Sequence, residues 1–111
     1  MAGDIAHRDV PTCTLADRLA DVRERVRAAG WDTCIVVNER QVVLGRLGRQ
    51  AIAADTNELV EQAMTSGPST VRPSIGADAL FERMRERNLA SLLVTTPDGR
   101  LVGLVRREDL E

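Results

Sequence analysis

The sequence predicts an α+β protein, α/β-like in the alternation of its elements, built from two copies of one plan. The chain repeats itself without a gap when Gly45 is set on Gly103, an offset of 58 residues (103 − 45). Each copy contains apolar residues at helical spacing. Each copy then has two short apolar runs joined by a turn, the pattern of a β-hairpin. The predicted order of each copy is therefore strand, helix, strand, strand, helix.

The first copy opens with an extended piece at Thr12-Cys13. Its predicted helix has one apolar face, with spacings of 4, 3, 4 and 3, made of Leu15, Leu19, Val22, Val26 and Ala29. Thr14 and Asp17 are expected to cap the first turn, and Gly30 to end the helix in the left-handed conformation. A hairpin follows, with strands over 34–37 and 41–47, and a short helix is expected to start at Arg49.

The second copy opens at Thr70-Val71, and Ser74 is the expected helix cap. The apolar face of its helix comprises Ala77, Leu80, Phe81 and Met84. Asn88 aligns with Gly30, and both residue types readily take the left-handed conformation. Strands are expected over 92–95 and 100–105, and a helical start at Arg107. Between the copies, Thr56 is expected to cap a short helix that runs through Met64.

One copy alone has too little apolar surface for a stable core, so we expect the two to pack sheet to sheet with pseudo-two-fold symmetry. We place the first repeat at residues 9–55 and the second, with its linker helix, at residues 56–111. The apolar fraction of 43% is that of a folded globular protein.

Composition also narrows the function. A net charge of −2, spread along the chain, disfavours nucleic-acid binding. No apolar run is long enough to cross a membrane, and no secretion signal is visible, so we expect a cytoplasmic protein. Two cysteines and one histidine form a poor zinc pattern, and His7 is expected to lie in a mobile N-terminal segment. Without a catalytic triad, metal cluster or phosphate loop, we expect no enzymatic activity.

The second copy resembles a CBS domain over nearly its whole length, "VEQAMTSGPSTVRPSIGADALFERMRERNLASLLVTTPDGRLVGLVRREDL". With the more divergent first copy, the chain resembles a CBS domain pair, or Bateman module, in a small stand-alone protein. The resemblance implies a regulatory module that binds AMP, ADP, ATP or S-adenosylmethionine in a cleft between repeats. It also implies a homodimer and an unknown protein partner, and no resident cofactor beyond the regulatory nucleotide.

The ligand pattern of that family is Gly, apolar, any, Thr or Ser, any, any, Asp or Asn. The second copy reads Gly103-Leu104-Val105-Arg106-Arg107-Glu108-Asp109. The resemblance implies that Asp109 holds the ribose, because a carboxylate can accept hydrogen bonds from both hydroxyls. Arg106 replaces the hydroxyl residue and would lie near the phosphates.

The resemblance also places the adenine beside Thr70, Val71 and Val105. The first copy has Gly48 at the hydroxyl position and Ala51 at the acidic position, so we expect at most one adenosine site per chain.

Several alternatives stay open at this stage. Asp109 could simply be an acid in the first turn of a helix, and Arg106 and Arg107 could pair with Glu108. The module could also be a ligand-free dimerisation or partner-docking unit whose pocket has degenerated. Cys13 and Cys34 align with apolar residues and are expected in the core, although their proximity to one another is undetermined. Trp31 is expected in the core, with an adenine wall as the alternative.

Overall fold

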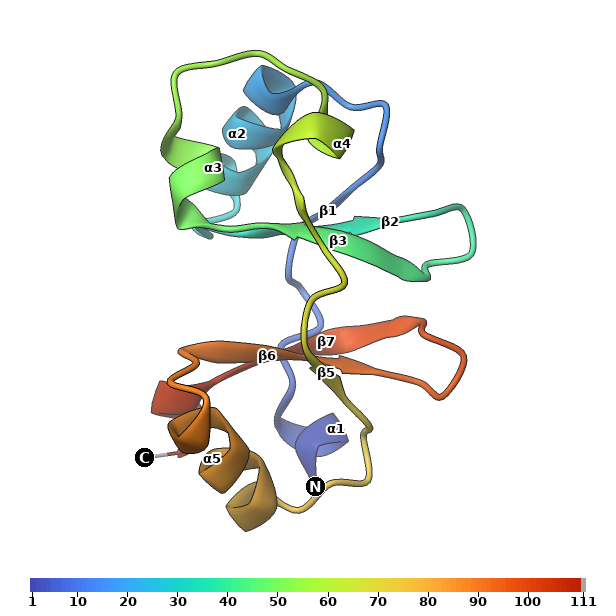
Figure 1. The fold of residues 1–111 in the computed structure, drawn as a ribbon, viewed down its shortest axis with the longest axis vertical. Helices are drawn as coiled ribbons and strands as arrows, with labels where there is room; N and C mark the ends of the chain where they lie inside the picture. Colours follow the sequence, from blue (N-terminus) through green and yellow to red (C-terminus); the bar gives the residue numbers. More distant parts are fainter. Residues whose placement is uncertain (111) are drawn as a thin grey trace. The chain divides into compact units, whose positions relative to one another are not determined.

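The structure, a computed structural model, describes residues 1–110 and contains two compact units (Figure 1). Unit 2 is continuous and spans Val10–Pro68. Unit 1 combines Met1–Asp9 with the chain from Ser69 onward. Both units mix helices with a small sheet, so the predicted α+β class is confirmed.

Unit 2 contains a four-stranded sheet in the order β1-β2-β3-β4. Its elements are, in chain order, β1 (Thr12–Cys13), α2 (Leu19–Ala28), β2 (Cys34–Val37), β3 (Val43–Leu47), α3 (Arg49–Ala53), α4 (Val60–Ala63) and β4 (Thr65–Ser66). β1 pairs parallel with β2, while the β2–β3 hairpin and the β3–β4 pair are antiparallel. The predicted strand over 41–47 begins only at Val43, because Gln41 takes a positive φ of 66°.

Unit 1 contains a three-stranded sheet in the order β5-β6-β7. Its elements are α1 (Ala2–Ile5), β5 (Thr70–Val71), α5 (Ala77–Glu86), β6 (Ser91–Thr95), β7 (Leu101–Arg106) and the 3₁₀ helix η1 (Arg107–Leu110). β5 pairs parallel with β6, and β6–β7 is the predicted antiparallel hairpin. The two units thus repeat one topology, as the sequence predicts.

The predicted helix ends are right at the C-terminal side and wrong at the N-terminal side. Gly30 has φ 77° and Asn88 has φ 52°, the left-handed conformation expected of both. The helices, however, start at Leu19 and Ala77, later than predicted, and neither is capped by the residue that precedes it. In α2 the first turn is served from the linker, since Asn57 Oδ1 accepts from the Ala20 main-chain N–H at 3.1 Å. The expected cap at Thr14 instead closes a turn ahead of α2, where its main-chain N–H donates to the Asp17 carboxylate at 2.9 Å.

The linker helix also begins late, at Val60 rather than after Thr56. Thr56 serves the fold through its main chain, since its carbonyl accepts a hydrogen bond from Arg23 at 3.0 Å.

Each unit has its own apolar core beneath one face of its sheet. In unit 2 the fully buried side chains of α2 are Leu19, Val22 and Val26. In unit 1 those of α5 are Leu80 and Met84. Phe81 is only half-buried, and the Arg85 guanidinium lies 5.8 Å from its ring centre. The larger residues of the predicted helix faces therefore point inward, whereas Ala29 and Ala77, also predicted on those faces, are exposed.

The repeat extends further toward the N-terminus than the sequence analysis recognised. Helix α4 lies 58 residues after helix α1 in the chain. The residues that follow these helices also correspond, because His7 pairs with Leu104 and Thr65 pairs with Arg46. In both cases the partner belongs to the copy that follows or precedes by 58 residues, so the two copies exchange these segments. Consequently α1, although it precedes the first repeat, packs in unit 1, and α4 packs in unit 2 (Figure 1). This exchange places the start of the chain beside β7.

Candidate functional site

The charged run after β7 folds into η1, and Asp109 closes its first turn. The Asp109 Oδ2 atom accepts a hydrogen bond from the main-chain N–H of Arg106 at 3.1 Å. This bond satisfies one of the donors that a helix start leaves without an intrahelical partner. Asp109 is therefore an acid in the first turn of a helix, as one of the two interpretations predicted. This hydrogen bond leaves other acceptor positions of the carboxylate available, since a carboxylate has about four.

The same oxygen of Asp109 has a second partner from the far end of the chain. His7 Nε2 lies 2.8 Å from Asp109 Oδ2, and both side chains are partly exposed, at 35% and 27%. The His7 main chain donates to the Leu104 carbonyl at 2.8 Å and accepts from the Leu104 amide at 3.0 Å. The expectation that His7 lies in a mobile segment is therefore wrong, because this segment forms an isolated antiparallel bridge with β7.

Gly103 has a physical role that the structure makes explicit. A Cβ atom at this position would lie 2.7 Å from the His7 carbonyl oxygen and 3.0 Å from Ala6 Cβ. Only glycine lets the N-terminal segment approach β7 this closely. Gly45 plays the same part in unit 2, where a Cβ would lie 2.9 Å from the Thr65 carbonyl oxygen.

The three residues expected near an adenine lie in different environments. Thr70 is half-buried on β5, whereas Val71 and Val105 are 3% and 0% exposed in the core of unit 1. The side chains of the two valines are thus occupied with core packing. Any contact they make with a ligand would involve main-chain groups.

Arg106 is the last residue of β7 and lies beside the two acids of η1, Glu108 and Asp109. Its Nη1 atom is 3.9 Å from Glu108 Oε1, a loose ion pair with the Glu108 side chain 73% exposed. Pairs of this kind contribute little to stability. The neighbouring Arg107 uses its main-chain N–H to bond the Ala90 carbonyl at 2.8 Å. The predicted pairing with Glu108 is therefore seen for Arg106.

The corresponding position of the first copy has no equivalent group. Gly48 precedes α3, and Ala51 stands inside it where Asp109 stands in the second copy. Arg49 pairs instead with Asp32, at 3.1 Å between Nε and Oδ2. The candidate ribose carboxylate is thus specific to unit 1.

Cys13 and Cys34 are core residues of unit 2, as predicted, with exposures of 3% and 1%. The two thiols are near enough to influence one another, which the sequence left undetermined. The neighbouring Cys34 thiol and burial raise the pKa of the Cys13 thiol far above its ordinary value. No group of three or more metal-ligating side chains occurs within residues 1–110.

Trp31 is half-buried and packs against the core of unit 2, in line with the core interpretation. Within the described chain, no helix is long and apolar enough to traverse a bilayer.

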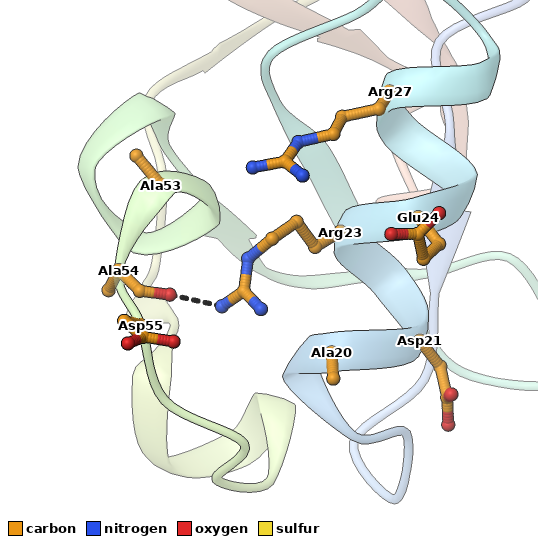
Figure 2. Close-up of a pocket in the computed structure, with 8 residues that line it drawn as sticks. All are labelled: Ala20, Asp21, Arg23, Glu24, Arg27, Ala53, Ala54 and Asp55. Atoms are coloured by element: carbon orange, nitrogen blue, oxygen red, sulfur yellow. Dashed lines mark hydrogen bonds between the residues drawn. The ribbon is translucent and has the colours of Figure 1, made fainter.

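A second candidate site is a shallow polar hollow between α2 and α3 (Figure 2). Its lining residues are Ala20, Asp21, Arg23, Glu24, Arg27, Ala53, Ala54 and Asp55. Arg23 reaches across it and donates to the carbonyls of Ile52 at 2.7 Å, Thr56 at 3.0 Å and Ala54. The guanidinium thereby ties down the chain after α3. We assign no ligand to this hollow, since its central cation already serves main-chain acceptors.

Comparison of the sequence with models of known protein families gives a match to the CBS domain over residues 60–110. This segment is a CBS domain. The matched segment contains Gly103, Arg106 and Asp109 and omits His7, which reaches the site from outside the match.

The whole chain is 21% identical to an uncharacterized protein of Methanopyrus kandleri over 116 aligned residues. The alignment covers 97% of the chain and 59% of that relative. The chain therefore spans about three fifths of the length of the curated relative it matches.

Several solved structures have the same fold. The cytosolic domain of the Mg²⁺ channel MgtE in complex with ATP superposes with a TM-score of 0.89, at 23% identity, over 98% of this chain and 46% of that one. The CBS domain pair of protein MJ0100, in complex with 5′-methylthioadenosine and S-adenosyl-L-methionine, gives 0.86 at 20% identity, over 99% and 91%. CBSX2 in complex with AMP gives 0.87 at 18%, over 98% and 91%. The predicted CBS-pair fold is confirmed over almost the whole chain.

Sequence reasoning missed His7 as a member of the site. The signal was present, because the 58-residue offset also sets Ala2, Ile5 and Ala6 on Val60, Ala63 and Met64. Extending the repeat to the start of the chain would have predicted a short helix at α1, although not the strand against which the next residues pair.

Proposed function

We propose that this CBS-domain protein is a regulatory module that binds an adenosine-containing ligand through unit 1. The observation that supports this most is the Asp109 carboxylate, which is partly exposed at the end of β7 and held in place by two donors. Both donors use Oδ2, and within residues 1–110 Oδ1 accepts no hydrogen bond. That oxygen is suited to the hydroxyls of a ribose.

The remaining contacts of the proposal follow the family pattern. Arg106 supplies a cation for the phosphates, since a guanidinium binds phosphate oxygens in pairs. Gly103 and Val105 supply main chain beside it, and Thr70 with Val71 would border the adenine. Three structural relatives were solved with ATP, AMP or S-adenosylmethionine, which supports adenosine chemistry for the ligand class.

Titration with AMP, ADP, ATP and S-adenosylmethionine, by calorimetry and by thermal unfolding, tests this function. A ligand that binds only the folded chain stabilises it by about 2.7 kcal/mol at a hundredfold excess over Kd. We expect saturable binding of at least one of these compounds, with one molecule per chain. No binding at millimolar concentration would leave a partner-docking module in its place.

The docking alternative has its own support in the structure. Arg106 stands where the family has a hydroxyl, and the side chains of Val71 and Val105 are enclosed in the core. A module that lacks a nucleotide would still present its helices to a partner chain. The two functions are separated by the titration above, because only the first predicts a saturable adenosine ligand.

We further propose a homodimer formed through the exposed faces of α2 and α5. Both helices place charged side chains outward, among them Glu24 and Arg27 of α2 and Glu82 and Arg83 of α5. Sedimentation at micromolar concentration should give twice the mass of one 12.2 kDa chain. A single 12.2 kDa species across that range would contradict the dimer.

A further inference from the structure

The histidine that meets Asp109 is held by main chain rather than by a flexible tail. His7 and Leu104 exchange both main-chain hydrogen bonds, at 2.8 and 3.0 Å, so the backbone of His7 is fixed against β7. Gly103 permits this approach, since a Cβ there would meet the His7 carbonyl at 2.7 Å. The imidazole therefore starts from a rigid position, which favours a defined geometry at Asp109.

Two donors then converge on a single carboxylate oxygen. Asp109 Oδ2 is 2.8 Å from His7 Nε2 and 3.1 Å from the Arg106 amide nitrogen. The terminal torsion of an aspartate is intrinsically broad, so one bond alone would leave the carboxylate plane loosely defined. The shorter second bond from His7 restrains that plane and leaves the acceptor positions of Oδ1 to another partner.

We propose that His7 is a positioning residue for ribose recognition, which restrains Asp109 through Oδ2 so that Oδ1 receives the ribose hydroxyls. This inference rests on the proposed adenosine function. The N-terminal segment thereby completes a site whose other residues come from the second repeat. His7 acts on affinity through Asp109, and its effect is confined to ligands that have ribose hydroxyls.

The test is a cycle of two ligands and three proteins. The ligands are AMP and 2′,3′-dideoxy-AMP, and the proteins are the parent chain, His7→Ala and His7→Gln. The free-energy cost of ordering one side chain on binding corresponds to about a three- to tenfold change in affinity, and in the parent chain His7 has already ordered Asp109. We expect His7→Ala to weaken AMP binding by that factor and to leave 2′,3′-dideoxy-AMP unchanged. His7→Gln, whose amide can also donate to Asp109, should recover part of the AMP affinity.

The other outcomes overturn the proposal in different ways. An equal loss for both ligands would mean that His7 only stabilises the fold. Tighter AMP binding by His7→Ala would mean that His7 competes with the ribose. Unchanged AMP binding would remove His7 from the site and leave the adenosine function intact. No AMP binding by the parent chain would overturn the adenosine function and this inference together.

Discussion

Asp109→Ala is expected to weaken AMP binding by at least about tenfold. Each charge-assisted hydrogen bond to the ribose contributes about 1.5–3 kcal/mol, and about 1.4 kcal/mol corresponds to a factor of ten in Kd. The variant loses both the acceptor Oδ1 and the oxygen that His7 and Arg106 restrain. Calorimetric titration of the parent and the variant with AMP measures the difference.

Glu108→Ala is the matched control for this experiment. Glu108 is the preceding acid on η1, with its side chain 73% exposed and a 3.9 Å pair to Arg106. Its removal takes away the same charge and should leave the Kd for AMP within about twofold, since exposed pairs contribute about 0–1 kcal/mol. Equal AMP binding by the parent and Asp109→Ala would show that the ribose lies elsewhere.

The role of Asp109 in the fold has to be measured separately. Its bond to the Arg106 amide closes the first turn of η1, and loss of such a cap costs about 0.5–2 kcal/mol of the free energy of unfolding. Denaturant unfolding of Asp109→Ala without ligand gives this contribution. The affinity change can then be compared at concentrations at which both proteins are fully folded.

Gly103→Ala is expected to lower the free energy of unfolding by about 1–3 kcal/mol, the usual cost of forcing an extra methyl group into a packed region. The new Cβ would meet the His7 carbonyl oxygen at 2.7 Å and Ala6 Cβ at 3.0 Å. The carbonyl oxygen belongs to the main chain and the Cβ atom is bonded directly to it, so no side-chain rotation can relieve either contact. We expect the N-terminal segment to move away from β7 and the two bonds between His7 and Leu104 to weaken.

Gly76→Ala provides the comparison within unit 1. Gly76 precedes α5 with φ −72°, and an added Cβ there meets no atom within 4 Å. Its substitution should cost less than about 1 kcal/mol, the size of a slightly weakened helix cap. Urea unfolding gives both free energies, and amide hydrogen exchange at Leu104 reports the strand itself. Unaltered protection of the Leu104 amide in Gly103→Ala would contradict the proposed displacement.

Local patterns in the sequence determined most of each repeat. Leu19, Val22 and Val26 repeat at helical spacing, and they are buried side by side on α2. Gly30 and Asn88 end their helices in the left-handed conformation, as their residue types predict. The helix starts were wrong, because Leu15 continues the apolar spacing ahead of α2 without belonging to the helix, and Ser74 does not cap α5. Side-chain periodicity reports which face is buried, and it does not report where the first helical hydrogen bond forms.

The sequence by itself also singled out Asp109, Arg106 and Gly103, because they stand at fixed spacing within one repeat. Only the tertiary structure decided what surrounds them. The pairing of His7 with Leu104, and the hydrogen bond from His7 to Asp109 102 residues away, depend on α1 packing in the unit of the other repeat. Neighbouring residues in the chain contain no record of that exchange. The exchange depends on the close approach of the His7 segment to β7 at Gly103, and this contact exists only in the folded chain.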